Sequence, residues 1–509
     1  MVTGSSLHWQ DGPVSTFAST GRAPNPLRPA PSGQALFPVG FGLAADRDLR
    51  VLAGGRALSG GSPKRLVRLR PRAADMARLW LGGGTVENRR ADRAVARRLV
   101  SSGLLHPRPP AMPPGVLVTV VVPVRDRPER LAGLLRSLGD SPCVVADDCS
   151  LNSEAIEKVA RDAGAEYLRL DAHSGPAAAR NAGLAGVLSP LIAFVDSDCE
   201  VPPGWLDGLV GHFADPKVAL VAPRVVTPPG PSWLARYESA RSPLDLGPDE
   251  GRVAPGTRLS YVPSAAIVVR RAAVAGVCFD ERLGAGEDVD LVWRLVEAGW
   301  DVRYAPGTEV THATSLRPAE WLARRALYGS TAGPLARRHG SALAPARVST
   351  VAAATWGLLA ARRPVAAVAV AGVSTAMLAS RLTGVVDDPL AEATRLSLSG
   401  TARSAAPVVA GLARAWGPLL VVAMFVRRLG RWRLAAAGAL AVGAARDWAS
   451  RPAGLDPFRY LTTRVADDLA YGTGLWWGCA RARTARPLCP AVATARRSVR
   501  SRGPGTQPR

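Results

Sequence analysis

The chain has 509 residues, too many for one ordinary domain and enough for two or three, and 47% of them are hydrophobic, which suffices for a packed core. Its formal net charge of +23 is concentrated at the two ends: residues 1–115 carry 17 Lys and Arg against 6 Asp and Glu, and residues 401–509 carry 18 Arg against 4 Asp. The near-neutral middle excludes a nucleic-acid enzyme along the whole length, and six cysteines without a CxxC pair or zinc spacing exclude a disulfide scaffold or a zinc module.

The first 110 residues predict a tail and a small module. Residues 1–34 are rich in Pro, Gly and Ser, which predicts a disordered tail; no basic segment precedes an apolar run there, so we expect no cleaved signal peptide and a cytoplasmic catalytic part. Residues 35–110 combine short strand-like runs, a turn at Gly54-Gly55 and apolar residues at helical spacing. This pattern predicts a winged-helix-like module. Such modules bind DNA, peptides or neighbouring domains, and a packing domain without a ligand fits equally well.

The middle of the chain predicts an α/β domain. Residues 107–114 are Pro-rich and indicate a stiff linker, and residues 116–124 form a continuous β-branched run typical of a central parallel strand buried on both faces. Helical and strand patterns then alternate, which predicts a Rossmann-like, doubly wound sheet over residues 111–345. In such sheets ligands bind at the carboxyl ends of the strands, and the polar motifs of this chain lie there.

After residue 345 the composition changes to Ala, Val and Leu with scattered Arg, which predicts a hydrophobic helical region over residues 346–480. The uncharged stretches 348–361 and 365–380 indicate a helical hairpin, although neither reaches the ~18 apolar residues of a clear spanning helix. With flanking arginines at the headgroups, the hairpin would embed in a bilayer, so we expect a cell-membrane location; a soluble Ala-rich subdomain is the alternative. Residues 481–509 predict a basic disordered tail.

The first two motifs follow the first two strands of this domain. Pro123, Arg125 and Asp126 lie in a strand-to-helix loop that can hold a nucleotide base. Asp148 follows the second strand, where its carboxylate can accept a hydrogen bond from the N–H group of a uracil ring, although an Asp in this position is also a common helix N-cap. Neither motif is specific by itself.

The third motif, residues 175–183, begins a helix of small residues with Arg180 one turn in. Small residues permit close approach of the backbone to a ligand. Arg180 would either pair with a phosphate of that ligand or hold an acidic neighbour.

The fourth motif places Asp196 and Asp198 at the end of an apolar strand, where residues two apart point the same way. Two like charges in this position are costly unless a cation accompanies them. Mg²⁺ or Mn²⁺ bridging to a diphosphate would meet this requirement, with phosphate and water completing its coordination. His312 is a further candidate metal ligand, although a lone His is more often structural.

The fifth motif places Glu287 and Asp288 at the start of a helix, directly after Gly284 and Gly286. The helix dipole favours acidic residues at this end, which is a sufficient structural explanation. The functional interpretation makes Asp288 the general base that takes a proton from an acceptor hydroxyl, with Glu287 in the substrate site. The glycines would allow the substrate to come close.

Taken in order, the motifs PVRDRP, VVADDCS, GPAAARNAG, FVDSD and GEDVDLVWR over residues 117–315 resemble glycosyltransferase family 2, which has the GT-A fold. The resemblance implies an inverting, metal-dependent transfer from a nucleotide-sugar donor. The roles it implies are base contact for Asp148, donor contact for Arg180, sugar or ribose contact for Asp196, metal ligation for Asp198 and general base for Asp288. Arg125 stands where the family often has an aromatic residue, so guanidinium stacking would replace ring stacking. No QxxRW motif is present, which argues against a polysaccharide-extruding synthase.

A narrower resemblance, over about residues 35–345, is to the mycofactocin-system glycosyltransferases, on GGSPKRLVRLRP, RRLVSSGLLHPRP, YESARSPLDLGP and YVPSAAIVVRRAA. It implies transfer of glucose from UDP-glucose to a hydroxyl of a peptide-derived redox-cofactor precursor, building a β-1,4-glucan, with a peptide-binding N-terminal module and no nucleic-acid partner. One alternative is a glycosyltransferase acting on polyprenyl phosphate or a cell-wall glycan. The other is a basic regulatory protein with an inactive transferase domain.

Overall fold

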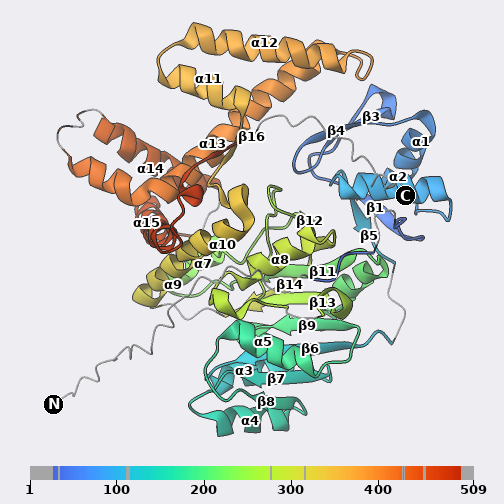
Figure 1. Ribbon diagram of the computed structural model, residues 1–509, viewed down its shortest axis with the longest axis vertical. Helices are drawn as coiled ribbons and strands as arrows, with labels where there is room; N and C mark the ends of the chain where they lie inside the picture. Colours follow the sequence, from blue (N-terminus) through green and yellow to red (C-terminus); the bar gives the residue numbers. More distant parts are fainter. Residues whose placement is uncertain are drawn as a thin grey trace, which may run out of the picture.

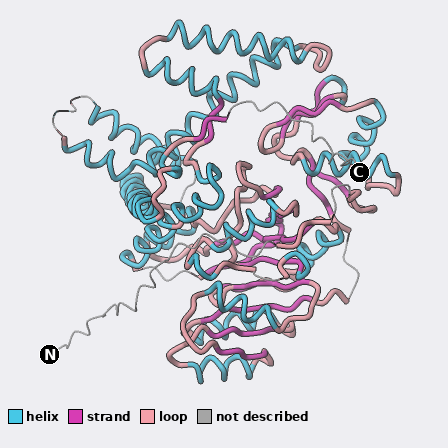
Figure 2. Tube along the Cα trace, in the orientation of Figure 1, coloured by secondary structure: helices cyan, strands magenta, loops and turns pink. Residues whose placement is uncertain are grey.

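The computed structural model describes residues 27–31, 35–110, 115–275, 278–313, 317–426, 428, 430, 432–450 and 454–493 (Figure 1). Most of the two predicted tails, and residues 111–114 of the predicted linker, lie outside the described residues. Figure 2 shows three regions along the chain: a small N-terminal module, a central sheet flanked by helices, and a group of long C-terminal helices.

The N-terminal module consists of a three-stranded antiparallel sheet followed by two helices, with a separate two-stranded ladder. Its core includes Phe37, Phe41, Trp80 and Leu99. The elements are β1 (Gly42–Ala45), β2 (Arg50–Leu52), β3 (Ala57–Gly60), β4 (Arg65–Arg68), α1 (Pro71–Leu81), α2 (Arg90–Ser101) and β5 (Leu105–Arg108), where β1 pairs with β5. Strand, turn and helices therefore follow the order that the apolar spacing predicts.

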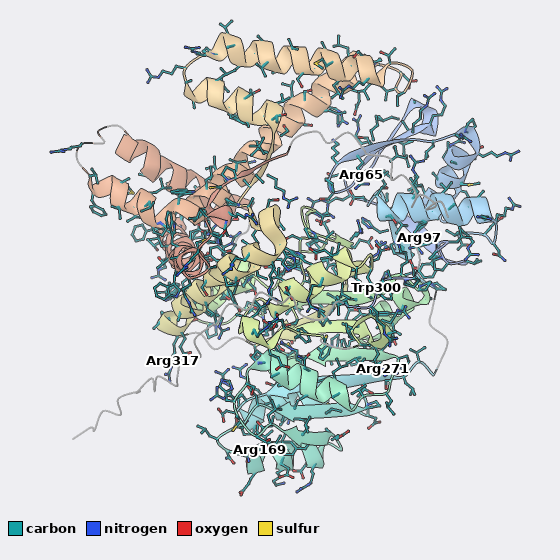
Figure 3. The ribbon with its side chains drawn as sticks, viewed as in Figure 1. Arg65, Arg97, Arg169, Arg271, Trp300 and Arg317 are labelled. Carbon is teal, nitrogen blue, oxygen red and sulfur yellow. The ribbon has the colours of Figure 1, made fainter. Side chains whose placement is uncertain are left out.

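A buried charge pair joins this module to the central domain. Arg97 of α2 lies where the module meets the central domain (Figure 3). It donates hydrogen bonds to both carboxylate oxygens of Asp215, at 2.7 and 2.8 Å, and lies 3.6 Å from Asp301. Breaking a buried pair by removing one partner typically costs about 3–5 kcal/mol, so this contact fixes the module against the sheet.

The central sheet has the strand order β10-β14-β11-β13-β9-β6-β7-β8, with β12 paired to β14. Strands β9, β6, β7 and β8 are parallel, as predicted, whereas β10, β12 and β13 run antiparallel to their neighbours. The sheet is therefore mixed, and only its first half is a doubly wound parallel sheet. The strands are β6 (Val118–Val124), β7 (Cys143–Asp147), β8 (Glu166–Arg169), β9 (Leu191–Val195), β10 (Cys199–Glu200), β11 (Val218–Val226), β12 (Gly251–Val253), β13 (Ala266–Arg270) and β14 (Asp301–His312).

Helices cover both faces of this sheet, which explains the uninterrupted apolar run of β6. Val120 and Val122 belong to the core beneath α3, α4 and α6, and Val121 belongs to the core beneath α5 and α8. Successive side chains of a strand point to opposite faces, so β6 must be apolar throughout. The helices of this domain are α3 (Pro128–Leu138), α4 (Ser153–Asp162), α5 (Pro176–Ala185), α6 (Asp207–Val210), α7 (Trp233–Arg241) and α8 (Glu287–Glu297).

Gly183 of α5 packs against the sheet rather than against a ligand. A Cβ atom at this position would lie 2.5 Å from Cγ1 of Val121. Three alanines of the same motif, Ala177, Ala178 and Ala179, are also buried. For Gly183 the predicted contact with a ligand is therefore wrong, because this glycine brings α5 close to β6, whereas Pro176 and Ala179 of the same motif line a cavity.

The C-terminal region is helical, as predicted, and its first hairpin projects away from the sheet (Figure 1). α12 and the segment Val408–Phe425 are long and apolar enough to cross a membrane, and only 11% and 17% of them are buried. The remaining elements are α9 (Pro318–Ser330), α10 (Ala332–His339), β15 (Arg347–Ser349), α11 (Thr350–Ala360), α12 (Pro364–Leu382), α13 (Pro389–Phe425), α14 (Trp432–Ser450), α15 (Pro457–Arg481) and β16 (Ala491–Ala493), where β15 pairs with β16.

Helix α15 is packed against α9 and α10 through glycines at spacing four on both sides. A Cβ atom at Gly474 would lie 1.8 Å from the carbonyl oxygen of Ala326, and one at Gly478 would lie 2.1 Å from that of Ser330. Gly329 and Gly333 make equally close contacts from the other side. Small residues at this spacing let two helix backbones approach closely, and here they hold the end of the chain against the central domain.

The glycine contact can be tested by adding a single methyl group. We expect Gly474→Ala to lower the free energy of unfolding by about 1–3 kcal/mol, because the backbone of Ala326 leaves no room for it. Gly438→Ala on α14 is the matched control, since nothing lies within 4 Å of its Cβ position, and it should stabilise by about 0.5–1 kcal/mol through helix propensity. Thermal unfolding of both variants measures this, and equal shifts would contradict the close packing.

Candidate active site

The five sequence motifs converge on one cavity of ≈ 960 Å³ at the carboxyl ends of β6, β7 and β9. Nine of the ten predicted site residues line it, namely Pro123, Arg125, Asp148, Arg180, Asp196, Asp198, Glu287, Asp288 and His312. They come from segments up to 189 residues apart in the sequence (residues 123 and 312). A cavity of this size suits a small-molecule ligand, and its position is the expected one for this class of sheet.

Asp126 is the tenth predicted residue, and it does not line the cavity. Its carboxylate accepts a hydrogen bond from the backbone N–H of Leu151 at 2.8 Å, and its own N–H donates to Oγ of Ser150 at 2.8 Å. Asp126 therefore braces the two loops that follow β6 and β7. A short polar residue suits its left-handed backbone, with φ of 59°.

Asp148 organises the loop that leads into α5. Its buried carboxylate accepts hydrogen bonds from the backbone N–H groups of Ser174 and Gly175, at 2.7 and 2.9 Å, and lies 2.7 Å from Nδ1 of His173. The alternative role as an N-cap is wrong, because the cap of α4 is Asn152, whose side chain accepts from Ala155. His173 also lines the cavity, and the sequence motifs did not indicate it.

Arg180 links two predicted carboxylates across the cavity floor. It donates to Oε1 of Glu287 at 2.9 Å and to Oδ1 of Asp196 at 2.6 Å, and its guanidinium lies 5.2 Å from the centre of the Phe279 ring. Burial alone would lower the pKa of Arg180, but Asp196 and Glu287 outweigh burial and raise the pKa above its ordinary value. Of the two roles considered for Arg180, the structure shows that it holds acidic neighbours.

Asp198 and His312 meet because β10 pairs with β14, with Cys199 opposite His312. Oδ1 of Asp198 lies 3.2 Å from Nε2 of His312, and both side chains line the cavity. Burial would raise the pKa of Asp198, but contact with His312 outweighs burial and lowers that pKa below its ordinary value. Burial would lower the pKa of His312, but contact with Asp198 outweighs burial and raises that pKa above its ordinary value. Each group therefore favours the charged form of the other.

This pair also fits a divalent metal. Two neighbouring ligands of an octahedral ion with bonds of about 2.1 Å lie about 3 Å apart, close to the observed separation. Among the described residues, no group of three or more His, Cys, Asp and Glu is arranged around a common point, so the protein would supply few ligands. Such sparse coordination is typical of Mg²⁺ and related ions that bind through substrate phosphates and water.

Asp288 lies on the cavity wall at the start of α8. It accepts hydrogen bonds from its neighbour Val289 at 2.7 Å and more weakly from the backbone N–H of Ser264 at 3.4 Å. Burial, followed by repulsion from Glu287, raises the pKa of Asp288 to about 7. A carboxyl group with this pKa takes up and releases protons near neutral pH.

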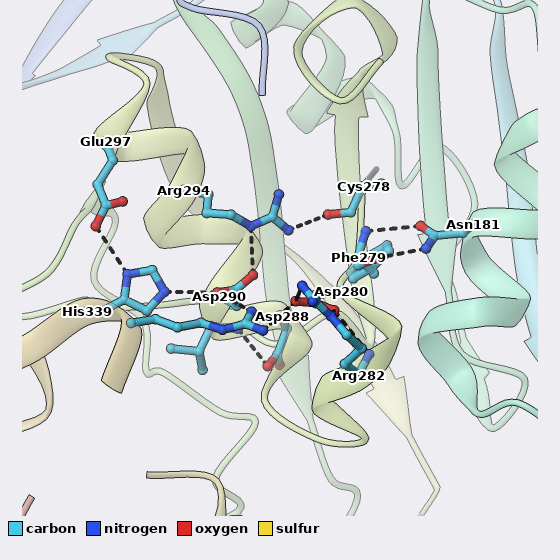
Figure 4. A network of polar contacts seen from close by, with 12 residues as sticks. Asn181, Cys278, Phe279, Asp280, Arg282, Asp288, Asp290, Arg294, Glu297 and His339 are labelled. Carbon is cyan, nitrogen blue, oxygen red and sulfur yellow. Dashed lines mark hydrogen bonds and ion pairs between the residues drawn. The ribbon is translucent and has the colours of Figure 1, made fainter. Parts of the chain in front are cut away.

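Asp290, only two residues further, has the opposite environment (Figure 4). It lies 2.9 Å from Nε2 of His339 and 2.7 Å from Nε of Arg294, and Arg338 is a third cationic partner at 3.2 Å. Burial would raise the pKa of Asp290, but these partners lower it to about 2. Asp290 is therefore a permanently ionised structural group, whereas Asp288 is free to titrate.

The C-terminal helices supply a wall of the cavity that the sequence motifs did not indicate. Arg324 and Tyr328 come from α9, Arg414 from α13, and Asp467 and Tyr471 from α15. Arg324 and Tyr328 are four residues apart and so share one face of α9. This spacing is a sequence signal from which their common position at the cavity could have been predicted. For α13 and α15 no local signal existed, because their contribution depends on the packing of distant helices.

Comparisons with known proteins point to one enzyme class. Residues 119–275 match the family model Glycosyl transferase family 2. The Pre-mycofactocin glycosyltransferase of Mycobacterium tuberculosis is 39% identical over 473 residues, which cover 90% of this chain and 99% of that protein. The Succinoglycan biosynthesis protein ExoU of Rhizobium meliloti is 30% identical over 198 residues, 36% of this chain and 57% of that protein. Among solved structures, the mannosyltransferase PcManGT from Pyrobaculum calidifontis, in complex with GDP-Man and Mn²⁺, aligns with a TM-score of 0.40 and 19% identity over 71% of this chain and 87% of that chain.

Proposed function

Since the chain belongs to glycosyltransferase family 2, and within it to the family of the pre-mycofactocin glycosyltransferases, we propose that it transfers glucose from UDP-glucose to a hydroxyl of the peptide-derived precursor of the redox cofactor mycofactocin. The observation that carries the reaction type is one cavity that holds both the Asp198–His312 pair and the titratable Asp288. The identities of glucose, UDP and the acceptor rest on the relationship to the Mycobacterium tuberculosis protein. We further propose that repeated transfer builds a β-1,4-glucan.

The donor would bind at the ends of β6, β7 and β9. Arg125 is exposed at the cavity and is suited to stack its guanidinium on the base, and Pro123, near the end of β6, also lines the cavity. Asp148 would act on the base mainly through the loop that it orders, where His173 faces the cavity. Asp196 keeps its second oxygen available for a ribose or sugar hydroxyl, because Arg180 occupies Oδ1.

Asp198 and His312 would hold Mn²⁺ or Mg²⁺. When bound, such an ion neutralises the negative charge that develops on the leaving diphosphate. Arg130 fixes this part of the site, since it donates to the carbonyl oxygen of Ala313 at 2.8 Å, next to His312. Arg324 adds positive charge on the same side of the cavity and is suited to face the diphosphate.

Asp288 would take the proton from the acceptor hydroxyl as the oxygen attacks the anomeric carbon. The diphosphate leaves from the opposite face, so the configuration at that carbon inverts in a single displacement. Gly286, with φ of 81°, allows the sharp turn into α8 that points Asp288 at the cavity. Glu287 faces Arg180 instead, so that we assign it a positioning role beside the base.

The metal assignment predicts the behaviour of Asp198→Asn. We expect it to weaken the binding of UDP in the presence of Mn²⁺ by at least about 100-fold, beyond the 10–100-fold loss typical of an outer-shell partner. Calorimetric titration of Mn²⁺ plus UDP measures this directly, without turnover. Asp162→Asn is the control, since Asp162 is exposed on α4 and pairs with Lys158. Unchanged Mn²⁺-dependent binding in Asp198→Asn would remove this residue from the metal site.

The base assignment predicts a pH dependence. We expect kcat/KM to rise about tenfold per pH unit below pH 7 and to level off above it, because only the ionised carboxylate of Asp288 can accept a proton. Asp288→Asn should lower the rate by about 10²–10⁴-fold and remove this limb of the profile. A variant with near-normal rate would exclude Asp288 as the base.

The same substitution should affect stability with a defined sign. The pKa of Asp288 is higher in the folded protein than its unfolded value of about 3.9, so its contribution to stability is present at low pH and is lost as the pH rises through about 7. Asparagine does not ionise. Asp288→Asn should therefore raise the melting temperature most at pH 8, less at pH 5 and little below about pH 4, which separates a catalytic loss from misfolding.

A polyprenyl phosphate or a cell-wall glycan is the alternative acceptor, and the exposed apolar helices are the observation that favours it. Assays of UDP-glucose turnover with a lipid extract and with the peptide-derived small molecule distinguish the two acceptors. A regulatory protein with an inactive transferase domain finds no support, because the family is one of glycosyltransferases and the five motifs converge on one cavity.

We propose that the N-terminal module binds a peptide connected with the peptide-derived acceptor, and that it does not bind nucleic acid. Strand β4 is an edge of its sheet, and a cavity of ≈ 500 Å³ lies between that strand and α2. Arg65 and Arg98 line this cavity. An edge strand beside a basic cavity is suited to an extended acidic peptide.

We also propose that the α11–α12 hairpin attaches the protein to the cell membrane, with the catalytic domain in the cytoplasm. α12 is apolar around its circumference, which is typical of helices in a core or in a membrane, yet it is largely outside the protein core. Its exposed side chains include Val365, Val368 and Val373, at 82%, 72% and 62%. Arg362 and Arg363 at the turn of the hairpin would reach the headgroups.

Vesicle binding tests this attachment. The triple variant Val365→Gln, Val368→Gln, Val373→Gln should bind phospholipid vesicles at least tenfold more weakly in co-sedimentation, because each change removes apolar surface from the bilayer. Leu188→Gln, at an exposed leucine of the central domain, is the control. High salt should not release the wild type. Release by salt, or equal binding of the triple variant, would exclude insertion of the hairpin.

A further inference from the structure

A second cavity of ≈ 430 Å³ lies among α13, α14 and α15, next to the candidate active site. The two cavities adjoin each other, because six residues line both: Arg241, Ala332, Leu343, Pro345, Arg414 and Tyr471. None of the six belongs to the strands and loops assigned to the donor. The second cavity therefore opens from the part of the active site formed by the C-terminal helices, where an acceptor has room.

Three arginines and two aspartates line this cavity, and ion pairs join them. Arg241 and Arg464 lie 3.0 and 3.5 Å from Asp447, Arg464 also pairs with Asp468, and Arg414 lies 3.7 Å from Asp468. Asp467, on the wall of the adjoining cavity, is 4.0 Å from Arg414 and 3.2 Å from Arg325. We call Arg241, Arg414, Arg464, Asp447, Asp467 and Asp468 the Arg/Asp cluster. Because each arginine of the cluster is paired with an aspartate, its attraction for an anion is reduced, and a neutral ligand fits better than a phosphate.

The Arg/Asp cluster offers hydrogen-bonding groups to the cavity. Nε of Arg241 and Nε of Arg414 are buried without a hydrogen-bond partner in the described part of the chain, whereas Nη1 of Arg464 and Oδ1 of Asp468 are in direct contact with each other. The Arg and Asp side chains that line the cavity carry both donors and acceptors, so the cavity is suited to a ligand with many hydroxyl groups and not to an acyl or prenyl chain.

Small residues keep this space open. Ala410, Gly411, Ala413 and Ala415 face it from α13, and Gly443 and Ala444 face it from α14. Gly443 lines the cavity, and nothing lies within 4 Å of a Cβ atom built on it, so a larger side chain has room at this position of the cavity wall. Tyr471 stands at the junction of the two cavities with the Arg414 guanidinium 3.8 Å from its ring centre, which holds the ring in place.

We propose that this second cavity binds the hexose units already attached to the acceptor, as an uncharged saccharide subsite. The inference rests on the proposed function and adds to it the place of the growing glycan. A sugar added next to Asp288 would pass into the second cavity before the following transfer. Glycosylated acceptors would therefore bind more tightly than the unglycosylated acceptor.

Filling the cavity tests the proposal. We expect Gly443→Leu to raise KM at least tenfold for an acceptor that carries two or more hexoses, and to leave the first transfer and KM for UDP-glucose unchanged. The acceptor that carries a single hexose would then accumulate as the product. Gly438→Leu is the matched control on the same helix, because its Cβ position is equally open and lies outside the cavity. Gly443→Ala gives a milder change if the leucine variant unfolds, as melting temperatures would show.

A binding measurement separates this proposal from the proposed function. Saturation-transfer NMR with cellotriose and the wild-type protein, with UDP and Mn²⁺ present, should give a signal that Gly443→Leu loses and Gly438→Leu keeps. If UDP binds but cellotriose binding is the same in both variants, the subsite is wrong and the donor site stands. If UDP does not bind, the proposed function fails. If Gly443→Leu instead abolishes transfer to polyprenyl phosphate alone, the cavity holds lipid and the inference is overturned.

Discussion

The buried guanidinium of Arg180 is the contact on which the active-site region depends. It joins Asp196 at the end of β9 to Glu287 at the start of α8, although these residues are 91 positions apart in the chain. Without Arg180, two carboxylates would face each other at the edge of the sheet, and leaving buried charges unpaired typically costs about 3–5 kcal/mol. Because Arg180 neutralises these two, Asp198 and Asp288 remain as the carboxylates to which we assign the proposed metal and proton-transfer roles. The same charge also limits how far the pKa of Asp288 rises.

Asp288 and Asp290 show how position within one helix turn separates chemistry from structure. Both lie in the first turn of α8, where the helix dipole favours negative charge. Asp290 points to Arg294, Arg338 and His339 and is held ionised, whereas Asp288 faces the cavity without a cation in direct contact among the described residues. Neighbouring carboxyl groups with widely separated pKa values are a common means of assigning catalytic roles. Here α10, which carries His339 and Arg338, produces that separation.

The sequence predicted the parts of the site that follow strands, and it did so for a physical reason. A buried strand must be apolar, so polar residues such as Arg125, Asp148 and Asp198 stand out where each strand ends. The sequence also predicted the parallel half of the sheet, but not the antiparallel strands β10, β12 and β13, because short paired segments carry no distinct pattern. Asp126 was assigned to the site and braces a loop instead, since spacing cannot show which way a loop residue points. Arg414 and Tyr471 could not be predicted at all, because only the packing of α13 and α15 brings them to the cavity.

That packing gives the C-terminal helices a role beyond attachment to a membrane. Helix α13 has 37 residues and is therefore about 55 Å long at 1.5 Å per residue. Near its start, Glu392 pairs with Arg50 of the N-terminal module at 2.9 Å, and two-thirds along its length Arg414 lines the active-site cavity. Glycine contacts in turn fix α15 against α9 and α10, so that Tyr471 and Asp467 keep their place opposite α8. One continuous helix thus sets the distance between the module and Asp288. A peptide bound to β4, as we propose, would therefore present its far end at a fixed distance from Asp288.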